Sequence, residues 1–181
     1  MKIEDNFLEP RKFNALQNVM LGDNFPWFYN STVVHKDEIS DKFQFIHGFY
    51  IHNVSQSSHT TSAPQAVIST EFETLKPILE IINPISLWRI KANLLTRTSS
   101  INEQTFHIDI DDFRIFSENL NHWRTAIFYV NTNNGYTEFE DGVKVESVAN
   151  RLVSFPTQLK HRGTSCTDEK TRVVINFNYF K

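Results

Sequence analysis

The chain has 181 residues, of which 40% are hydrophobic and 22% are charged, the composition of a folded protein with room for a sizeable core. Its formal net charge of -3 provides no basic field, so the composition gives no support for nucleic-acid binding. The single cysteine, Cys166, excludes an intrachain disulfide and favours a reducing compartment.

The first residues, MKIEDNFLEP, lack the apolar segment of a signal peptide, and no stretch approaches the roughly 18 apolar residues of a membrane span. We therefore expect a cytoplasmic protein without membrane contact. Residues 2–8 are typical of a short strand. A helix is predicted from Pro10 to a stop at Gly22, with an apolar face formed by Phe13, Leu16 and Met20.

Farther along, aromatic and β-branched residues predict strands at 27–29 and 43–52. The polar segment 53–62 has no periodicity and is expected to be a loop. A second helical region is expected over about 64–83. Its proline, Pro77, would kink or restart the helix, and its apolar stripe is formed by Phe72, Leu75, Leu79 and Ile82.

After Pro84 the pattern changes to short strands. They are expected at 85–96, 104–110, 125–131, 137–140, 151–155 and 172–180, with turn signals at 133–135 and 141–142. This pattern favours a mainly β fold with N-terminal supporting helices, a double-stranded β-helix or jelly roll. We expect a single domain over 1–181, in which 1–84 supply helical support and outer strands and 85–181 form the jelly-roll core.

Candidate metal ligands occur in the segment FHIDIDDF, residues 106–113. Side chains alternate along an extended chain, so His107 and Asp109 would point the same way. His161 follows in FPTQLKHRGTS, where a strand ends. Two histidines and one carboxylate can form the facial triad of non-haem iron(II) oxygenases, which leaves coordination positions open, unlike a closed structural zinc site.

An arginine follows His161 at the start of the last expected strand. Burying Arg172 in a small barrel is costly unless it meets a carboxylate. Its planar fork suits a bidentate contact with the far carboxylate of a bound dicarboxylic acid. Taken alone, Arg172 is better interpreted as a surface arginine at the entrance of a strand. Near a metal triad, it would instead be an anion-binding residue.

His107-x-Asp109, His161 and Arg172, in this order and spacing, resemble the 2-oxoglutarate/Fe(II) oxygenase superfamily, and in particular its prolyl-4-hydroxylase-like branch. The stretch WRTAIFYVNTNNGYTEFEDG (123–142) resembles a strand–turn–strand of that branch and places Tyr129 at a co-substrate-binding tyrosine. GYTEF (135–139) resembles its Gly-Gly-x-Thr-x-Phe pattern. The likeness covers residues 85–180.

The resemblance implies an Fe(II)- and 2-oxoglutarate-dependent dioxygenase with dioxygen as second co-substrate. His107, Asp109 and His161 would be the catalytic metal ligands, and Arg172 and Tyr129 would bind the distal carboxylate of 2-oxoglutarate. The implied reaction is hydroxylation of an unidentified substrate: a prolyl residue, another protein side chain or a small metabolite.

The sequence departs from the family on the strand before the His-x-Asp motif. A tyrosine that contacts the co-substrate is often found there, whereas this chain has Leu94 near that place, with Asn93 as a substitute in a shifted register. Many relatives also carry a serine two residues after the arginine, where this chain has Val174. That difference leaves Tyr129 as the main partner of Arg172.

Several other residues could take part in the site. Asp111 would share the face of Asp109 but is expected to lie outside the coordination sphere. On the strand that leads to the site, Trp88, Arg89 and Lys91 are interpreted as structural, although one face could meet substrate. The segments 53–62 and 99–104 are candidate lids.

Two other readings stay open. A cupin-like metalloenzyme would keep the jelly roll and the metal but would not need Arg172 as a dicarboxylate anchor. A metal-free jelly-roll binding module would require the triad and Arg172 to coincide without a shared purpose. Fold alone does not decide between these functions.

Overall fold

The computed structural model describes residues 1–33, 42–53, 65–110 and 122–181. Asp111 and nearly all of the expected loop at 53–62 lie outside these residues. The helical elements are α1 (Pro10–Met20), the 3-10 helix η1 (Thr70–Leu75) and α2 (Lys76–Ile82). The strands are β1 (Lys2–Glu4), β2 (Phe28–Asn30), β3 (Gln44–Asn53), β4 (Gln65–Ile68), β5 (Ser86–Thr96), β6 (Trp123–Tyr129), β7 (Tyr136–Phe139), β8 (Lys144–Glu146), β9 (Arg151–Pro156), β10 (His161–Gly163) and β11 (Thr171–Phe180).

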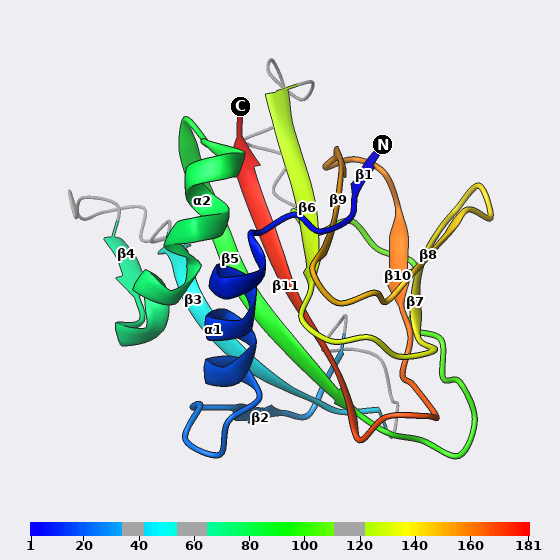
Figure 1. Ribbon diagram of the computed structural model, residues 1–181. Coiled ribbons are helices and arrows are strands. Elements are labelled where there is room, and N and C mark those ends of the chain that lie inside the picture. The colour runs from blue at the N-terminus through cyan, green and yellow to red at the C-terminus, as the bar shows by residue number, and fades with distance from the viewer. Residues whose placement is uncertain (34–41, 54–64, 111–121) are drawn as a thin grey trace, which may run out of the picture.

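The strands form two antiparallel sheets. The major sheet has the order β1-β9-β6-β11-β5-β3-β2, with β4 also paired to β3, and the minor sheet has the order β10-β7-β8. Helices α1 and α2 lie over one face of the major sheet, and the minor sheet lies on its other side (Figure 1). The predicted mainly β jelly roll with supporting N-terminal helices is confirmed.

The first helix begins and ends for local reasons. Pro10 occupies the first turn, where its missing N–H costs nothing, and the carboxylate of Glu9 accepts hydrogen bonds from the backbone N–H groups of the next residues. Three apolar side chains spaced along one face are buried under the sheet, as predicted; they are Phe13, Leu16 and Met20.

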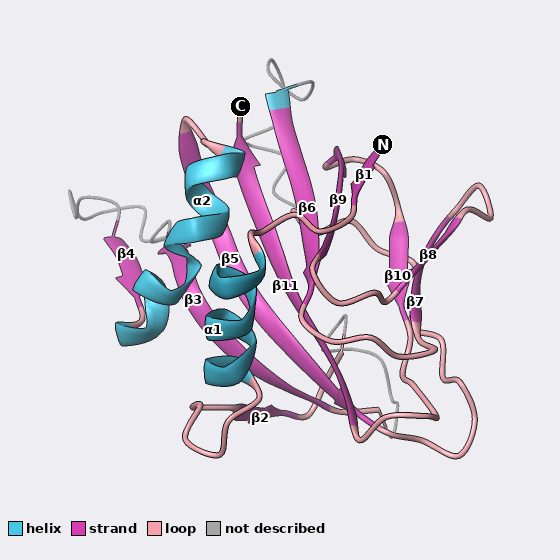
Figure 2. Cartoon of the chain, in the orientation of Figure 1, coloured by secondary structure: helices cyan, strands magenta, loops and turns pink. Residues whose placement is uncertain are grey.

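The expected helix over 64–83 is only partly correct. Residues Gln65–Ile68 form strand β4, which pairs with β3, because this β-branched segment meets an open strand edge there. The Ser69 hydroxyl then caps η1, and Pro77 lies in the first turn of α2 rather than kinking a longer helix. Asn83, with a φ of 48°, ends α2. Figure 2 shows the helical segments gathered beside the strands.

Neighbouring residues of the central strands enter different layers. On β11, alternate residues pack in the core between the sheet and the helices; these are Val173, Ile175, Phe177 and Tyr179. The intervening residues face the space between the two sheets, where Arg172, Val174 and Asn176 line a pocket. The same alternation on β5 buries Ile90 and Ala92 on the helix side. One face therefore supplies the main core, and the other supplies the lining of the pocket.

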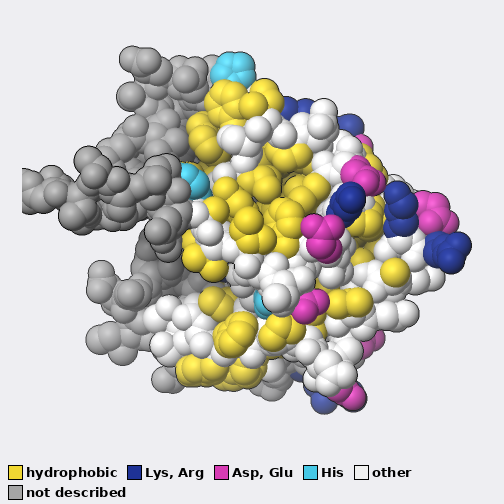
Figure 3. Space-filling view, turned by 90° about the vertical axis from the view of Figure 1, so that its left-hand side faces the viewer, with side chains coloured by type: hydrophobic (Ala, Val, Ile, Leu, Met, Phe, Trp, Pro, Cys, Tyr) yellow, Lys and Arg dark blue, Asp and Glu magenta, His cyan; other side chains and the backbone are white. Residues whose placement is uncertain are grey.

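Apolar side chains are also exposed on strands outside the centre of the major sheet. Phe28 and Tyr29 lie on β2, and Val67 and Ile68 lie on β4. Figure 3 shows hydrophobic side chains gathered over one face of the molecule. Among the residues that the structure describes, no helix is both long and apolar enough to cross a membrane.

Candidate metal centre

The segment that carries His107 is not the continuous strand expected over 104–110, and it bends at Asp109. It meets the minor sheet through two isolated bridges, Glu103 with Thr164 and His107 with His161. In the second bridge, each histidine N–H donates to the carbonyl oxygen of the other, at 2.9 and 3.0 Å. The two side chains are therefore direct cross-strand neighbours, with ring centroids 4.9 Å apart.

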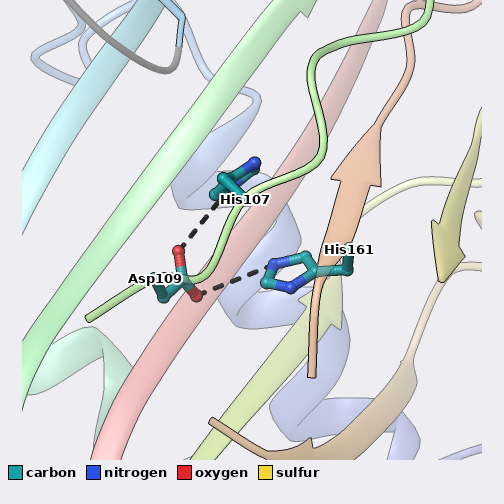
Figure 4. A group of neighbouring side chains, drawn as sticks. All are labelled: His107, Asp109 and His161. Atoms are coloured by element: carbon teal, nitrogen blue, oxygen red, sulfur yellow. Dashed lines mark ion pairs between the residues drawn. The ribbon is translucent and has the colours of Figure 1, made fainter. Parts of the chain in front are cut away.

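The structure brings His107, Asp109 and His161 together, with one possible ligand atom from each within 4.8 Å of the others. Nε2 of each histidine lies 3.9 Å from a carboxylate oxygen of Asp109 (Figure 4). His107 and Asp109 come from the same segment and His161 from β10. Metal–ligand bonds of about 2.0–2.2 Å would let the three atoms converge on one ion after small side-chain movements.

The hydrogen bonds of both histidines fit a metal site. Nδ1 of His107 donates to the Thr105 carbonyl at 3.0 Å, and Nδ1 of His161 donates to the Leu159 carbonyl at 3.2 Å. Because a carbonyl only accepts, this tautomer leaves a lone pair on each Nε2. Nε2 of His161 is buried and has no hydrogen-bond partner among the described residues. A buried polar atom without a partner is costly, and a metal ion would satisfy it.

Asp109 is held from both sides. Nη2 of Arg89 donates to Oδ1 and the amide of Asn178 donates to Oδ2, each at 3.0 Å. Burial alone would raise the pKa of Asp109, but Arg89 and the two histidines hold this pKa well below its usual range. Burial lowers the pKa of His107, which keeps its ring neutral and able to bind a metal.

Arg172 lies at the other end of the same pocket and is 2% exposed. Its Nε donates to the Ser147 hydroxyl at 2.8 Å and its Nη2 to the Thr137 hydroxyl at 3.2 Å. In the part of the chain that the structure describes, no carboxylate pairs with it. Burial lowers the pKa of Arg172, yet a guanidinium stays protonated at neutral pH. The pocket therefore contains a buried cation that has no carboxylate partner among the described residues and whose Cζ lies 5.8 Å from the centroid of the Tyr129 ring.

Tyr129 is fully buried behind Thr137, and its hydroxyl donates to the Thr137 hydroxyl at 2.8 Å. Thr137 itself lines the pocket, so it links Tyr129 to Arg172 and to the space that a ligand would fill. Sequence reasoning gave Thr137 no role in the site. Its place in the GYTEF motif, on the same face of the strand as Phe139, is the sequence feature that could have identified Thr137 as a site residue.

Two glycines keep the space around Arg172 open. A Cβ on Gly135 would lie 2.6 Å from Cδ of Arg172 and 2.6 Å from the Ser165 carbonyl oxygen. A Cβ on Gly163 would lie 3.4 Å from Nη1 of Arg172, in the wall of the pocket. Position 135 needs glycine because a side chain there would collide with the Ser165 backbone, whereas at position 163 an added Cβ would be tight against side-chain ends that can move.

Asn93 and Leu94, on the strand before the His-x-Asp motif, face opposite sides of the major sheet. Asn93 lines the pocket, whereas Leu94 packs against the helix-side core. Lys91, two residues before Asn93 on the same face, also lines the pocket, and Arg89 holds Asp109. Sequence reasoning interpreted Lys91 and Arg89 as structural and did not foresee the contact with Asp109, because that contact joins residues from different segments.

No protein-family model matches this sequence, and no curated protein aligns with it. Solved structures with a similar fold include a prolyl hydroxylase from Trichoplax adhaerens in complex with a hypoxia inducible factor oxygen degradation domain peptide fragment. The TM-score is 0.64 at 14% identity over 99% of this chain and 82% of that one. A prolyl-4-hydroxylase from Pseudomonas putida gives a TM-score of 0.58 at 14% identity over 99% of this chain and 92% of that one. A 2OG-Fe(II) oxygenase family protein from Burkholderia pseudomallei gives 0.59 at 10% identity over 94% and 77%.

These likenesses show that the chain has the jelly-roll fold found in structures of 2OG-Fe(II) oxygenases and prolyl hydroxylases. At such low identity they carry no residue roles across. The arrangement of His107, Asp109 and His161 is a possible metal site by its own geometry. The roles assigned to these three residues and to Arg172 and Tyr129 stay predictions.

Proposed function

We propose that this protein is an Fe(II)- and 2-oxoglutarate-dependent dioxygenase that hydroxylates a prolyl residue, another protein side chain or a small metabolite. The whole chain would act as one oxygenase domain. His107, Asp109 and His161 would hold the metal ion, and Arg172 would bind the far carboxylate of 2-oxoglutarate. Tyr129 would act through the Thr137 hydroxyl, which its own hydroxyl contacts.

One observation carries the proposal. A single pocket contains three convergent ligand atoms at one end and a buried arginine with no carboxylate partner among the described residues at the other. A buried guanidinium of this kind is costly to the free protein unless an anion enters. A dicarboxylate that chelates the metal with one end and meets Arg172 with the other satisfies both ends together.

The protein's own groups have separate tasks. Arg89 and Asn178 fix the two oxygens of Asp109, and the carbonyls of Thr105 and Leu159 fix the orientation of the two imidazoles. When bound, the metal and 2-oxoglutarate would supply an oxidative decarboxylation: 2-oxoglutarate would lose carbon dioxide, one atom of dioxygen would enter the succinate that is left, and the other would enter a substrate C–H bond as a hydroxyl group.

Two structures with a similar fold suggest a substrate class to test first. One of these prolyl hydroxylases was solved with a peptide fragment, and a viral collagen prolyl hydroxylase from Paramecium bursaria Chlorella virus-1 was solved with 2OG. A peptidyl proline is therefore the first substrate to try, followed by free amino acids and other small metabolites.

The test is an anaerobic titration of the metal-free protein with iron(II) and then with 2-oxoglutarate, followed through the weak visible charge-transfer band of the chelate. The wild-type protein should give the band. His107→Ala should lose it, and Arg172→Met should need about a hundredfold more 2-oxoglutarate, because a desolvated charge-assisted contact is removed.

Arg97→Met is the matched control, since Arg97 is exposed and does not line the pocket. It should leave the 2-oxoglutarate titration unchanged. If the wild-type protein binds iron but gives no charge-transfer band, 2-oxoglutarate is not its co-substrate, and a cupin-like metalloenzyme is favoured. Failure to bind iron would favour a jelly-roll binding module.

A further inference from the structure

Lys91 is a second cation in the pocket that the proposed function leaves unused. It lies on β5 between Arg89 and Asn93, and it lines the same pocket as the three candidate metal ligands and Arg172. Within residues 1–33, 42–53, 65–110 and 122–181, its ammonium group makes no hydrogen bond or ion pair. Burial, and then the charge of Arg89, lower the pKa of Lys91 to about 8, while Asp109 opposes the shift. At neutral pH the group is therefore still mainly charged.

The charges in and around the pocket do not balance. Arg89 offsets Asp109, with which it forms an ion pair at 3.0 Å. A divalent ion and a dicarboxylate co-substrate would offset each other. The charges of Lys91 and Arg172 therefore remain as an excess even in a fully loaded pocket, and an excess of desolvated positive charge favours one more anion.

The polar groups beside Lys91 also lack partners. Asn176 on β11 pairs with Lys91 in the sheet register, and Asn93 lies two residues after Lys91 on β5. The side-chain oxygens of both asparagines are buried without a hydrogen-bond partner among the described residues. Each amide can turn either its oxygen or its NH2 group toward a ligand, so the pair can donate to an acid group or accept from a hydroxyl.

We propose that Lys91 binds an acid group of the substrate, so that this enzyme oxidises a carboxylate-bearing compound. This inference rests on the proposed function, because it places the substrate beside the metal that His107, Asp109 and His161 would hold. The ammonium group would meet the substrate carboxylate, and the amides of Asn93 and Asn176 would hydrogen-bond to polar groups next to it.

One other carboxylate could reach Lys91. The metal-chelating carboxylate of 2-oxoglutarate itself would lie in the same pocket, and it offers the same chemistry to an ammonium group. The two sources differ in one measurable respect. A contact with the co-substrate would change the affinity for 2-oxoglutarate, whereas a contact with the substrate would not.

The first measurement needs neither iron nor turnover. Zinc-loaded protein saturated with N-oxalylglycine, an unreactive 2-oxoglutarate analogue, is titrated with propionate and benzoate and with their amides, propionamide and benzamide. Binding is followed by ligand-observed NMR. In the wild-type protein the acids should bind about tenfold more tightly than the amides, because one charge-assisted contact distinguishes them.

Lys91→Met should abolish this preference, and Lys91→Arg, which retains the charge, should keep part of it. Met is close to Lys in length and removes a partly buried charge, so the variant should fold with an unchanged or higher melting temperature. Lys12→Met is the control, because Lys12 lies on the exposed face of α1 in an ion pair with Glu80. It should preserve the full preference for acids.

The second measurement is the iron(II) and 2-oxoglutarate titration of wild-type protein and Lys91→Met. The dissociation constant of 2-oxoglutarate should agree within about twofold if the acid belongs to the substrate. A tenfold increase in this constant, with acids and amides binding alike, would overturn the inference in favour of the co-substrate.

Equal binding of acids and amides to the wild-type protein, or a preference that survives in Lys91→Met, would also overturn the inference. Absence of the charge-transfer band in the wild-type protein would overturn the proposed function. The NMR comparison would then still decide separately whether Lys91 binds an acid.

Discussion

The two faces of β5 and β11 bury very different groups. Toward the helices, Ile90, Val173 and Phe177 pack into a continuous apolar core. Toward the minor sheet, the neighbouring residues Lys91 and Arg172 place charged groups in the pocket. A strand exposes alternate residues to opposite sides, so both environments come from the same short sequences.

This difference separates stability from function within single strands. Burial of apolar side chains on the helix face drives folding. Burial of charged and unpaired polar groups on the pocket face opposes folding until a ligand satisfies them. Loss of a core side chain should therefore lower stability, whereas loss of an unpartnered polar group from the pocket should raise it. Three pairs of variants test the core, the wall beside Arg172 and the pocket face in turn.

The largest effect is expected on the helix face. Phe177→Ala removes a fully buried ring from the main core and should lower the free energy of unfolding by about 3–5 kcal/mol. Phe28→Ala removes a ring that is 60% exposed and should cost well under 1 kcal/mol, about 0.5. Urea denaturation of the two variants measures both values. Similar losses in the two would show that the helix-side core does not dominate stability.

A medium effect is expected where the backbone approaches Arg172. Gly135→Ala places a methyl group against Cδ of Arg172, which must move. We expect a loss of about 1–3 kcal/mol in stability and about tenfold weaker 2-oxoglutarate binding. Gly142, at a φ of 86°, has nothing within 4 Å of an added Cβ.

Gly142→Ala therefore carries backbone strain alone, roughly 1 kcal/mol, and should leave 2-oxoglutarate binding as it is. Iron and 2-oxoglutarate titrations together with thermal unfolding measure both variants. Unchanged 2-oxoglutarate binding in Gly135→Ala would contradict the idea that the position of the guanidinium matters.

The smallest single change, at Asn176, belongs to a pair of β11 asparagines whose substitutions should differ in sign. The Asn176 oxygen is buried without a described partner, so Asn176→Leu should stabilise the free protein by about 1 kcal/mol. Asn178 donates to Asp109 and Thr125 and accepts from Arg89. Asn178→Leu should therefore destabilise by about 1–3 kcal/mol. Chemical denaturation of the metal-free variants measures the difference, and two changes of the same sign would refute the comparison.

The sequence predicted the parts of this arrangement that depend on local pattern. The two-residue spacing put His107 and Asp109 on one side of their segment, and a strand was expected to begin at Arg172. The apolar face of α1 was equally evident from Phe13 and Leu16. These features follow from the geometry of one helix or one extended segment.

Features that depend on pairing between distant segments were missed. The contact of Arg89 with Asp109 joins β5 to the segment 104–110. The link from Tyr129 through Thr137 to Arg172 depends on how the two sheets face each other. Strand β10 has three residues and no apolar alternation, so only its pairing with β7 identifies it.

The bridge between His107 and His161 gives the candidate site a topological property. A metal ion that joins these two residues would close a chain loop that contains β6, β7, β8 and β9. Closing such a loop removes conformational entropy from the unfolded chain, as a covalent cross-link does. The jelly roll would then contain a reversible staple in place of a disulfide, which suits a chain with one cysteine.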